Sequence, residues 1–243
     1  MRTIALISTV ALAAFATACH AVGNAEETGP RAQRDFPVAG AFDKIALEGS
    51  PDVVVTVGGA AAVHAEGDQE MIDRLEIVNE NGQLRIGYRH DSGSWFSWSH
   101  HRGVTVHVTL PALAGASIAG SGDMRIDRVQ GPAFAGTVTG SGGMNVASLT
   151  ADQASFSVTG SGDITAAGRA RQANASITGS GDLHLTQLEA ANATVAVAGS
   201  GDIGIRATET AAIELRGSGD VTVAGPARCT INKSGSGDVH CGA

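Results

Sequence analysis

Aromatic residues, cysteines and prolines are all scarce in this chain. Aromatic side chains make up 4% of its 243 residues, and there are three cysteines and six prolines. A core built from Val, Ile, Leu and Ala with so few bulky rings must be narrow. After the first 18 residues, no apolar run is long enough to indicate a transmembrane helix.

Positive charge is also in short supply. The 16 Lys and Arg residues stand against 24 Asp and Glu residues, which gives a formal net charge of −8. Residues 1–18 contain Arg2 and no acid, so their removal changes this value to −9 (−8 − 1). An acidic chain of this kind argues against nucleic acid and against anionic lipid headgroups as main partners.

The first 18 residues are typical of a signal peptide. An apolar run from Ile4 to Ala18 has the length of a secretion signal and is too short to cross a bilayer. Small residues precede Cys19, which suits either ordinary signal peptidase cleavage or lipoprotein processing that attaches a diacylglycerol to Cys19. Ala16 stands where such a lipoprotein signal usually has Leu. We favour lipidation; either route exports the protein to the periplasm, the outer membrane or the cell surface.

Glycine, by contrast, is abundant. The chain has 33 glycines, about twice the usual share, and many belong to one repeated motif. The motif GSGD occurs in seven near-identical copies at intervals of 18–20 residues. The copies begin at Gly120, Gly140 (as GSGG), Gly160, Gly179, Gly199, Gly217 and Gly235. A nearly constant period of this kind predicts a repeat architecture.

Apolar residues alternate with polar or small residues on both sides of each motif. Phe156 and Val158 precede one copy by four and two residues, and Ile203 and Ile205 follow another by four and six residues from its first glycine. Such alternation predicts two short strands, each with one buried face, that meet at a glycine-rich corner. A looser return loop is expected to complete each repeat.

Two topologies fit this pattern, a meander of hairpins and a coil. In a coil, each residue lies about 4.8 Å above its equivalent in the previous turn, so equivalent corners should match. All seven copies have Ser in second place, and six of the seven have Asp in fourth place. This identity favours the coil. We therefore predict an all-β protein with a β-solenoid, similar to a parallel β-helix, over residues 112–243.

The repeated corners have a structural and a metal-binding interpretation. Glycine would supply positive φ, and the aspartate would accept N–H bonds from its own turn. The alternative is a calcium column, by analogy with Gly/Asp-rich nonapeptide repeats. Stacked carboxylates repel by only about 1 kcal/mol in water, and Gly143 interrupts the column, so we predict structural corners without a cofactor. The corner residues are Gly120, Asp123, Gly160, Asp163, Gly179, Asp182, Gly199, Asp202, Gly217, Asp220, Gly235 and Asp238.

The remaining chain divides into a tether and a capping module. Residues 19–35 are rich in Gly, Ala and Glu and are predicted to be flexible. Residues 36–111 are predicted to form an irregular β module that caps the solenoid, since an uncapped coil leaves an open edge. Its expected elements are a repeat-like unit around Gly49 with Pro51 in place of the second glycine, helical turns at 68–74, a hairpin at 75–86 with a type I′ turn at Asn81-Gly82, and a strand at 103–110.

Several of these motifs occur together in one known family. The order FDKIALEGSPDVVV, DRLEIVNENGQLRI, VTVHVTLPAL and then serial GSGD resembles the bacterial family called putative auto-transporter adhesin, head GIN domain. The resemblance covers nearly all of residues 36–242. It implies an exported β-helical protein, often a lipoprotein, for which an adhesive role is proposed, and it brings no catalytic residues.

One stretch lies outside the repeat pattern and is the candidate binding surface. Trp95, Phe96 and Trp98 lie on a loop rich in Ser and Gly, and they could stack on a sugar or anchor a protein partner. The loop could instead fold over the end of the coil. A third interpretation is a transition-metal site formed by His90, Asp91, His100 and His101.

The other two cysteines lie in the last repeat. Cys229 and Cys241 occupy inward positions six residues before and after its first glycine. In an exported chain they are predicted to form a disulfide that holds the last turn, the alternative being two buried thiols. Lys233 occupies a position in this repeat that is apolar elsewhere.

No pattern in the chain indicates catalysis. The outward column five residues after each first glycine is too mixed to suggest a site; it holds Arg125, Asn145, Thr165, His184 and Thr222. We predict a non-catalytic, lipid-anchored envelope protein with a structural or adhesive role and an unidentified surface ligand, glycan or protein. The alternatives are a β-helical enzyme acting on polysaccharide and a calcium-dependent binding module. No oligomeric state is predicted.

Overall fold

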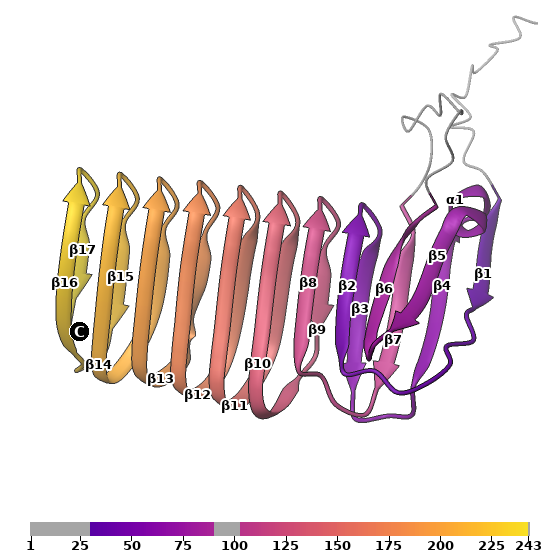
Figure 1. Cartoon of the computed structure of the whole chain (residues 1–243), viewed down its shortest axis with the longest axis horizontal. Coiled ribbons are helices and arrows are strands. Elements are labelled where there is room, and N and C mark those ends of the chain that lie inside the picture. Colours follow the sequence, from indigo (N-terminus) through magenta and orange to yellow (C-terminus); the bar gives the residue numbers. More distant parts are fainter. Residues whose placement is uncertain (1–29, 90–102, 243) are drawn as a thin grey trace, which may run out of the picture.

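Residues 115–241 wind into a parallel β-solenoid (Figure 1). The computed structural model describes residues 30–89 and 103–242. Each turn from Gly120 onward lies parallel to the turn before it, with equivalent corners in register. The prediction of a coil rather than a meander is confirmed. The strands are β8 (Gly115–Gly120), β9 (Met124–Ile126), β10 (Val129–Gly140), β11 (Gly143–Gly160), β12 (Asp163–Gly179), β13 (Leu183–Gly199), β14 (Ile203–Gly217), β15 (Val221–Ala224), β16 (Arg228–Gly235) and β17 (Val239–Cys241).

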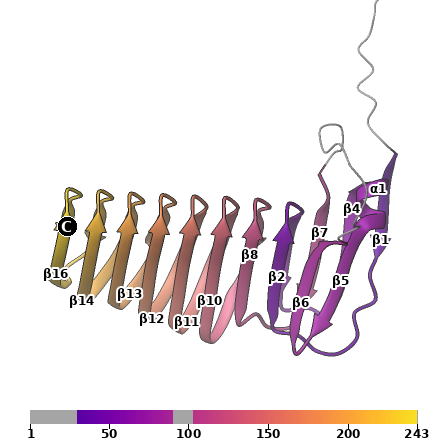
Figure 2. The ribbon, with the colours of Figure 1, turned by 45° about the horizontal axis from the view of Figure 1, so that its top comes forward.

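The segments predicted as loose return loops are strands, which corrects that expectation. β11, β12 and β13 run without interruption from one corner to the next. Leu149 and Leu188 lie within these segments and are fully buried. Shifts of register in the return segments absorb the variation in repeat length, as at Val146/Leu149, where a repeat of 20 residues meets one of 19. The corners themselves can therefore stay in line (Figure 2).

The first turn of the solenoid comes from a segment distant in the sequence. β2 (Lys44–Gly49) and β3 (Asp52–Val57) lie parallel to β8 and β9, and Gly49 is in register with Gly120. The repeat-like unit around Gly49 therefore belongs to the solenoid, although the sequence analysis placed it in the N-terminal module. The capping residues lie between these two turns in the sequence but outside them in space.

The cap covers the N-terminal end of this first turn. β6 and β7 lie parallel to β2 and β3, and antiparallel strands then close the sheet on the outside. The turn between β5 and β6 has positive φ at both Asn81 and Gly82, as a type I′ turn requires. The elements are β1 (Arg31–Asp35), β4 (Ala62–Asp68), α1 (Gln69–Arg74), β5 (Leu75–Glu80), β6 (Gln83–Tyr88) and β7 (Thr105–Leu110).

The predicted tether extends too far along the chain. Residues 19–35 were expected to be flexible, but Arg31–Asp35 forms β1 and pairs antiparallel with β4. The backbone N–H and C=O groups of β4 provide the partners that a polar segment needs in order to become a strand.

Slim aliphatic side chains fill the interior of the solenoid. The inward residues of the middle turns are almost completely buried, as illustrated by Val158 and Leu185. Phe134 and Phe156 are the exceptions in size, and their ring centroids lie 6.1 Å apart. Gly136 makes room for them, because a Cβ atom there would lie 3.2 Å from the ring of Phe156. The interior is thus a packed core.

Candidate binding site

Several of the predicted site residues lie outside the described part of the chain. These are Cys19 with the signal peptide, and the aromatic segment with Trp95, Phe96 and Trp98. The proposed metal ligands His90, Asp91, His100 and His101 lie there too. The described chain resumes at Gly103, which borders a cavity in the cap.

Both corner glycines are needed, for different physical reasons. The first glycine of each motif has φ between 120° and 143°, a region that favours glycine. A Cβ atom there would also lie only 2.0–2.5 Å from the carbonyl oxygen of the equivalent glycine one turn earlier. The second glycine has no such φ, yet its Cβ would lie 1.9–2.3 Å from a backbone oxygen. Close stacking of the turns, rather than backbone conformation alone, requires the second glycine.

The corner aspartates connect successive turns. The expectation that each would bond within its own turn is wrong, because from Asp163 to Asp220 each Oδ1 accepts the backbone N–H of the equivalent residue one turn later. The donors are Asp182, Asp202, Asp220 and Asp238, with N···O distances of 2.7–2.9 Å. The series, which we call the aspartate ladder, begins at Asp52, whose Oδ1 accepts the N–H of Asp123 at 3.1 Å.

The aspartate ladder is interrupted at Gly143. The N–H of Gly143 still donates to Oδ1 of Asp123 at 2.9 Å. Gly143 has no carboxylate for the next turn, so the N–H of Asp163 donates to the carbonyl oxygen of Gly142 at 3.3 Å. A shallow groove of about 410 Å³ lies at this interruption. We call it the Gly143 groove; its polar side chains are Asp123, Arg125, Asn145, Asp163 and Thr165.

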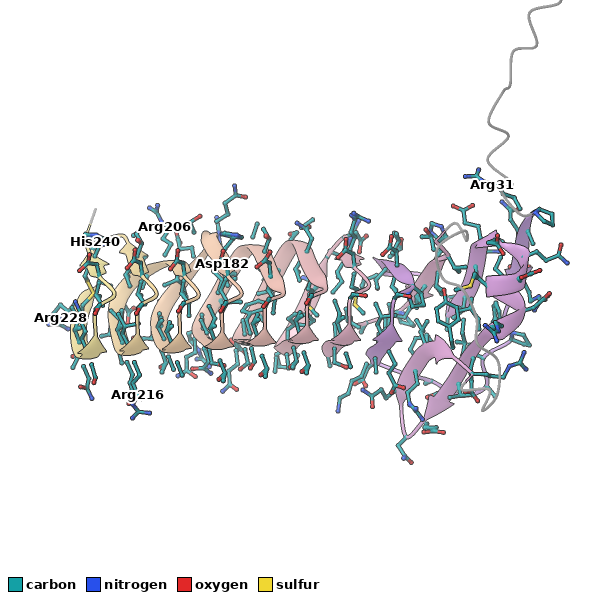
Figure 3. The ribbon with its side chains drawn as sticks, turned by 90° about the horizontal axis from the view of Figure 1, so that it is seen from above. Arg31, Asp182, Arg206, Arg216, Arg228 and His240 are labelled. Atoms are coloured by element: carbon teal, nitrogen blue, oxygen red, sulfur yellow. A yellow bond between two sulfur atoms is a disulfide. The ribbon has the colours of Figure 1, made fainter. Side chains whose placement is uncertain are left out.

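The side chains of the Gly143 groove come from two neighbouring columns on one face. Arg125, Asn145 and Thr165 are in register on successive turns. In Figure 3, Asp182 in a middle turn and His240 in the last turn lie on one side of the solenoid, and Arg216 lies on the other. In the described part of the chain, the side chain of Arg125 forms no hydrogen bond or ion pair. From the sequence, this column was judged too mixed to indicate a site. The signal that could have indicated one was the missing carboxylate at Gly143, beside the column.

A second polar site lies on the outer face of the cap. His64 and His107 are directly opposite each other on β4 and β7, with ring centroids 6.3 Å apart. Nδ1 of His64 lies 2.8 Å from Asp35, and Nε2 of His107 lies 3.4 Å from Glu66. A cavity of about 460 Å³ borders Glu66. Sequence reasoning missed this pair, since only strand register brings the two histidines together.

Metal ligands do not converge at either site. Within residues 30–89 and 103–242, no group of three or more His, Cys, Asp or Glu side chains could hold a metal ion. The same residues include no helix with the length and apolar character needed to cross a membrane.

Two ionisable side chains beside the first turn are perturbed by their surroundings. Burial, followed by the charges of Asp52 and Asp68, raises the pKa of Tyr88 to about 12. Arg85 donates hydrogen bonds to Glu48 and Glu80, which raise its pKa further above the usual value. Both residues lie on β6, where the cap meets the solenoid.

The last turn is held by a disulfide. Cys229 and Cys241 are joined, with their Cα atoms 6.5 Å apart. None of the described strands covers this end, so Ile231 is 47% exposed and Cys241 faces solvent. Lys233, in a column that is otherwise apolar, places Nζ 3.5 Å from Asp238.

This architecture matches one protein family over most of its length. The profile of the family described as "Putative auto-transporter adhesin, head GIN domain" matches residues 41–227. The chain belongs to this family. The match takes in the first turn of the solenoid, most of the cap and all but the last of the GSGD corners. A search of curated proteins found no match to this head GIN protein.

Solved structures share the fold of the head GIN protein. A putative adhesin from Bacteroides fragilis NCTC 9343 has a TM-score of 0.79 at 22% identity, with 87% of this chain and 96% of that chain covered. A putative lipid binding protein from Parabacteroides distasonis ATCC 8503 has a TM-score of 0.70 at 21% identity, with coverages of 88% and 98%. A putative adhesin from Parabacteroides merdae ATCC 43184 has a TM-score of 0.68 at 18% identity, with coverages of 88% and 97%.

Proposed function

We propose that this protein is an exported, non-catalytic adhesive module that is anchored to the envelope through a lipid on Cys19. The family match over residues 41–227 carries the proposal. The similar solved structures described as putative adhesins support it. A packed interior leaves the outer faces of the solenoid as the surfaces on which a partner could bind.

The position of the first described strand supports an orientation at the membrane. β1 lies at the cap end, and the last turn lies at the opposite end of the long axis (Figure 1). The segment from Cys19 to Arg31 can span at most about 40 Å when fully extended. A lipid on Cys19 would therefore keep the cap near the membrane, while the solenoid faces stay accessible to surface ligands.

The aromatic segment remains the proposed contact for a glycan or protein ligand. Trp95, Phe96 and Trp98 belong to a segment that joins the described chain at Arg89 and Gly103, both in the cap. An indole ring can stack on a sugar or serve as an apolar anchor in a protein partner, and either contact suits adhesion without catalysis. The lipid-binding description of the Parabacteroides distasonis protein finds little support here, since side chains fill the solenoid interior.

The test is retention of protein-coated beads on a glycan array, on matrix proteins and on cells. The wild-type protein should be retained on at least one of these surfaces. The double variant Trp95→Ala, Trp98→Ala should lose retention while its far-UV circular dichroism and melting temperature are unchanged. Absence of wild-type retention on every surface would refute adhesion. Mass spectrometry of the mature N-terminus tests the anchor separately, because an unmodified Cys19 excludes lipidation.

A further inference from the structure

We propose that the Gly143 groove binds one sugar unit of a glycan through hydrogen bonds to Asp123, Arg125, Asn145, Asp163 and Thr165. The inference rests on the proposed adhesive function: it names a glycan as the ligand and adds, on the solenoid, a second contact to the one proposed for the aromatic segment. It is carried by the single interruption of the aspartate ladder and by the polar side chains that surround this interruption.

The interruption creates space between two fixed carboxylates. Asp123 and Asp163 lie one turn before and one turn after Gly143, and are therefore about 9.6 Å apart along the axis. At the other repeated corners an aspartate occupies the equivalent position. At Gly143 the outer face of this column has a groove of about 410 Å³.

Each of these carboxylates has one oxygen in use and one available. Oδ1 of Asp123 accepts the N–H of Gly143, and Oδ1 of Asp163 accepts the N–H of Asp182. Neither Oδ2 forms a hydrogen bond or ion pair within the described residues. Asp123 and Asp163 both line the groove, so each brings an anionic acceptor to it, and hydroxyl groups are suitable donors to such acceptors.

The neighbouring column supplies the donors. Arg125 has five N–H groups without a protein partner in the described chain. Asn145 and Thr165 each offer both a donor and an acceptor. The two aspartates and one arginine give the groove a net charge of −1, which disfavours phosphate or sulfate. A sugar carries several hydroxyls that both donate and accept, and it matches this mixed set.

A shallow groove without an aromatic platform predicts weak binding by each copy. We expect a Kd on the order of 1 mM for a single sugar. Many copies anchored on one surface would bind a repetitive glycan far more tightly than one copy does.

One substitution fills the groove and also completes the aspartate ladder. Gly143→Asp restores the residue found at equivalent corners, and Gly143 has no positive φ that would exclude a side chain. A Cβ atom there would lie 3.1 Å from Oδ1 of Asp123, so only a carboxylate must adjust. The melting temperature should remain within about 3 °C of wild type. The matched control is Asp202→Gly, which opens a similar gap beside His184 and Gly204 rather than beside an arginine.

Binding is measured by the amide chemical shifts of the folded protein during titration with methyl α-mannoside, methyl β-galactoside or glucosamine, each to about 50 mM. At least one sugar should shift the amides of Gly143, Asn145 and Asp163 saturably. Gly143→Asp and Arg125→Ala should weaken this binding at least tenfold, and Asp202→Gly should create no second site. Absence of saturable shifts with all three sugars, or unchanged binding by Gly143→Asp, would overturn the inference.

Failure of this inference and failure of adhesion are distinguishable. If beads coated with Gly143→Asp are retained on the same surfaces as wild type, adhesion stands and the groove is not its contact. If sugars bind the groove but wild-type beads are retained nowhere, the groove assignment stands and adhesion does not.

Discussion

Removal of one carboxylate from the aspartate ladder should destabilise the solenoid at a defined place. In Asp202→Ala, the N–H of Asp220 loses the acceptor that now lies 2.7 Å away. The N–H of residue 202 still donates to Asp182, because this bond needs only the backbone. The substitution therefore deletes one bond between turns and leaves the adjacent one in place.

The size of the effect follows from two opposing terms. A hydrogen bond to a charged acceptor contributes about 1.5–3 kcal/mol, and exposure of Asp202 to solvent places it at the lower end. Each carboxylate is also repelled by its neighbours one turn away, by about 0.9 kcal/mol per pair in water before salt screening. Asp202 has two such neighbours, Asp182 and Asp220. Screening at about 0.15 M salt reduces each repulsion to about 0.5 kcal/mol, so Asp202→Ala relieves about 1 kcal/mol and we expect a net loss of about 0.5–1.5 kcal/mol. Asp202→Asn retains an oxygen acceptor and should lose less.

Urea unfolding and amide hydrogen exchange would measure these changes. Exchange of the Asp220 amide should accelerate in Asp202→Ala and much less in Asp202→Asn. Asp238→Ala is the control, because within the described residues no backbone N–H donates to this carboxylate, and its exposed ion pair with Lys233 contributes less than about 1 kcal/mol. Equal protection of the Asp220 amide in wild type and Asp202→Ala, or an equal loss of stability in the control, would refute the claim that the aspartate ladder stabilises the solenoid. Increasing NaCl from low concentration should stabilise the wild type by screening the repulsion.

Three further outcomes follow from the structure. Gly217→Ala should lower the free energy of unfolding in urea by at least about 3 kcal/mol, since the φ of Gly217 is +136° and a Cβ atom would lie 2.0 Å from a carbonyl oxygen. The control, Gly131→Ala, places its Cβ in open space and should lower this free energy little. Tyr88 is the only tyrosine, so titration by absorbance at 295 nm should show a pKa near 12. Its raised pKa contributes stability below about pH 10, and this stability is lost as the pH rises through 12. The loss should be absent in Tyr88→Phe. Reduction of Cys229–Cys241 should lower the melting temperature, with up to about 3 kcal/mol of stabilisation removed, and accelerate exchange in β16 and β17 without affecting β11.

The solenoid could be predicted from the sequence because the same local pattern occurs seven times. Alternation of apolar residues defines strands with one buried face, and the repeated corner indicates that neighbouring turns are equivalent. Ser and Asp at fixed places add a requirement for register that a meander does not have. The pairings of Gly140 with Gly160 and of Gly199 with Gly217 satisfy this requirement.

The hydrogen bonds of the corner could not be predicted from the same pattern. An aspartate carboxylate can reach N–H groups of its own turn or of an adjacent turn, and only the stacked geometry decides between them. The return segments were misjudged for a related reason. Their polar residues resemble a loop in isolation, whereas parallel neighbours on both sides hold β11 and β12 extended.

Contacts between distant segments explain what the sequence left open about the candidate sites. The proximity of His64 and His107 depends on the antiparallel register of β4 and β7, which no local motif encodes. Prediction of the Gly143 groove would have required two facts together. The missing carboxylate was visible in the sequence, but its position beside Arg125 depends on the parallel register of β9 and β11.

The two ends of the solenoid are finished by different physical means. At the N-terminal end, β6 and β7 cover the first turn and antiparallel strands complete the cap. At the C-terminal end no strand of residues 30–89 and 103–242 covers the outer edge of β16, whose backbone groups could pair with another chain. Lys233 lies there in register with the buried Leu215. Stacking another chain on this edge would bury the ammonium group in an apolar column, at a cost of several kcal/mol, so the charge opposes end-to-end association.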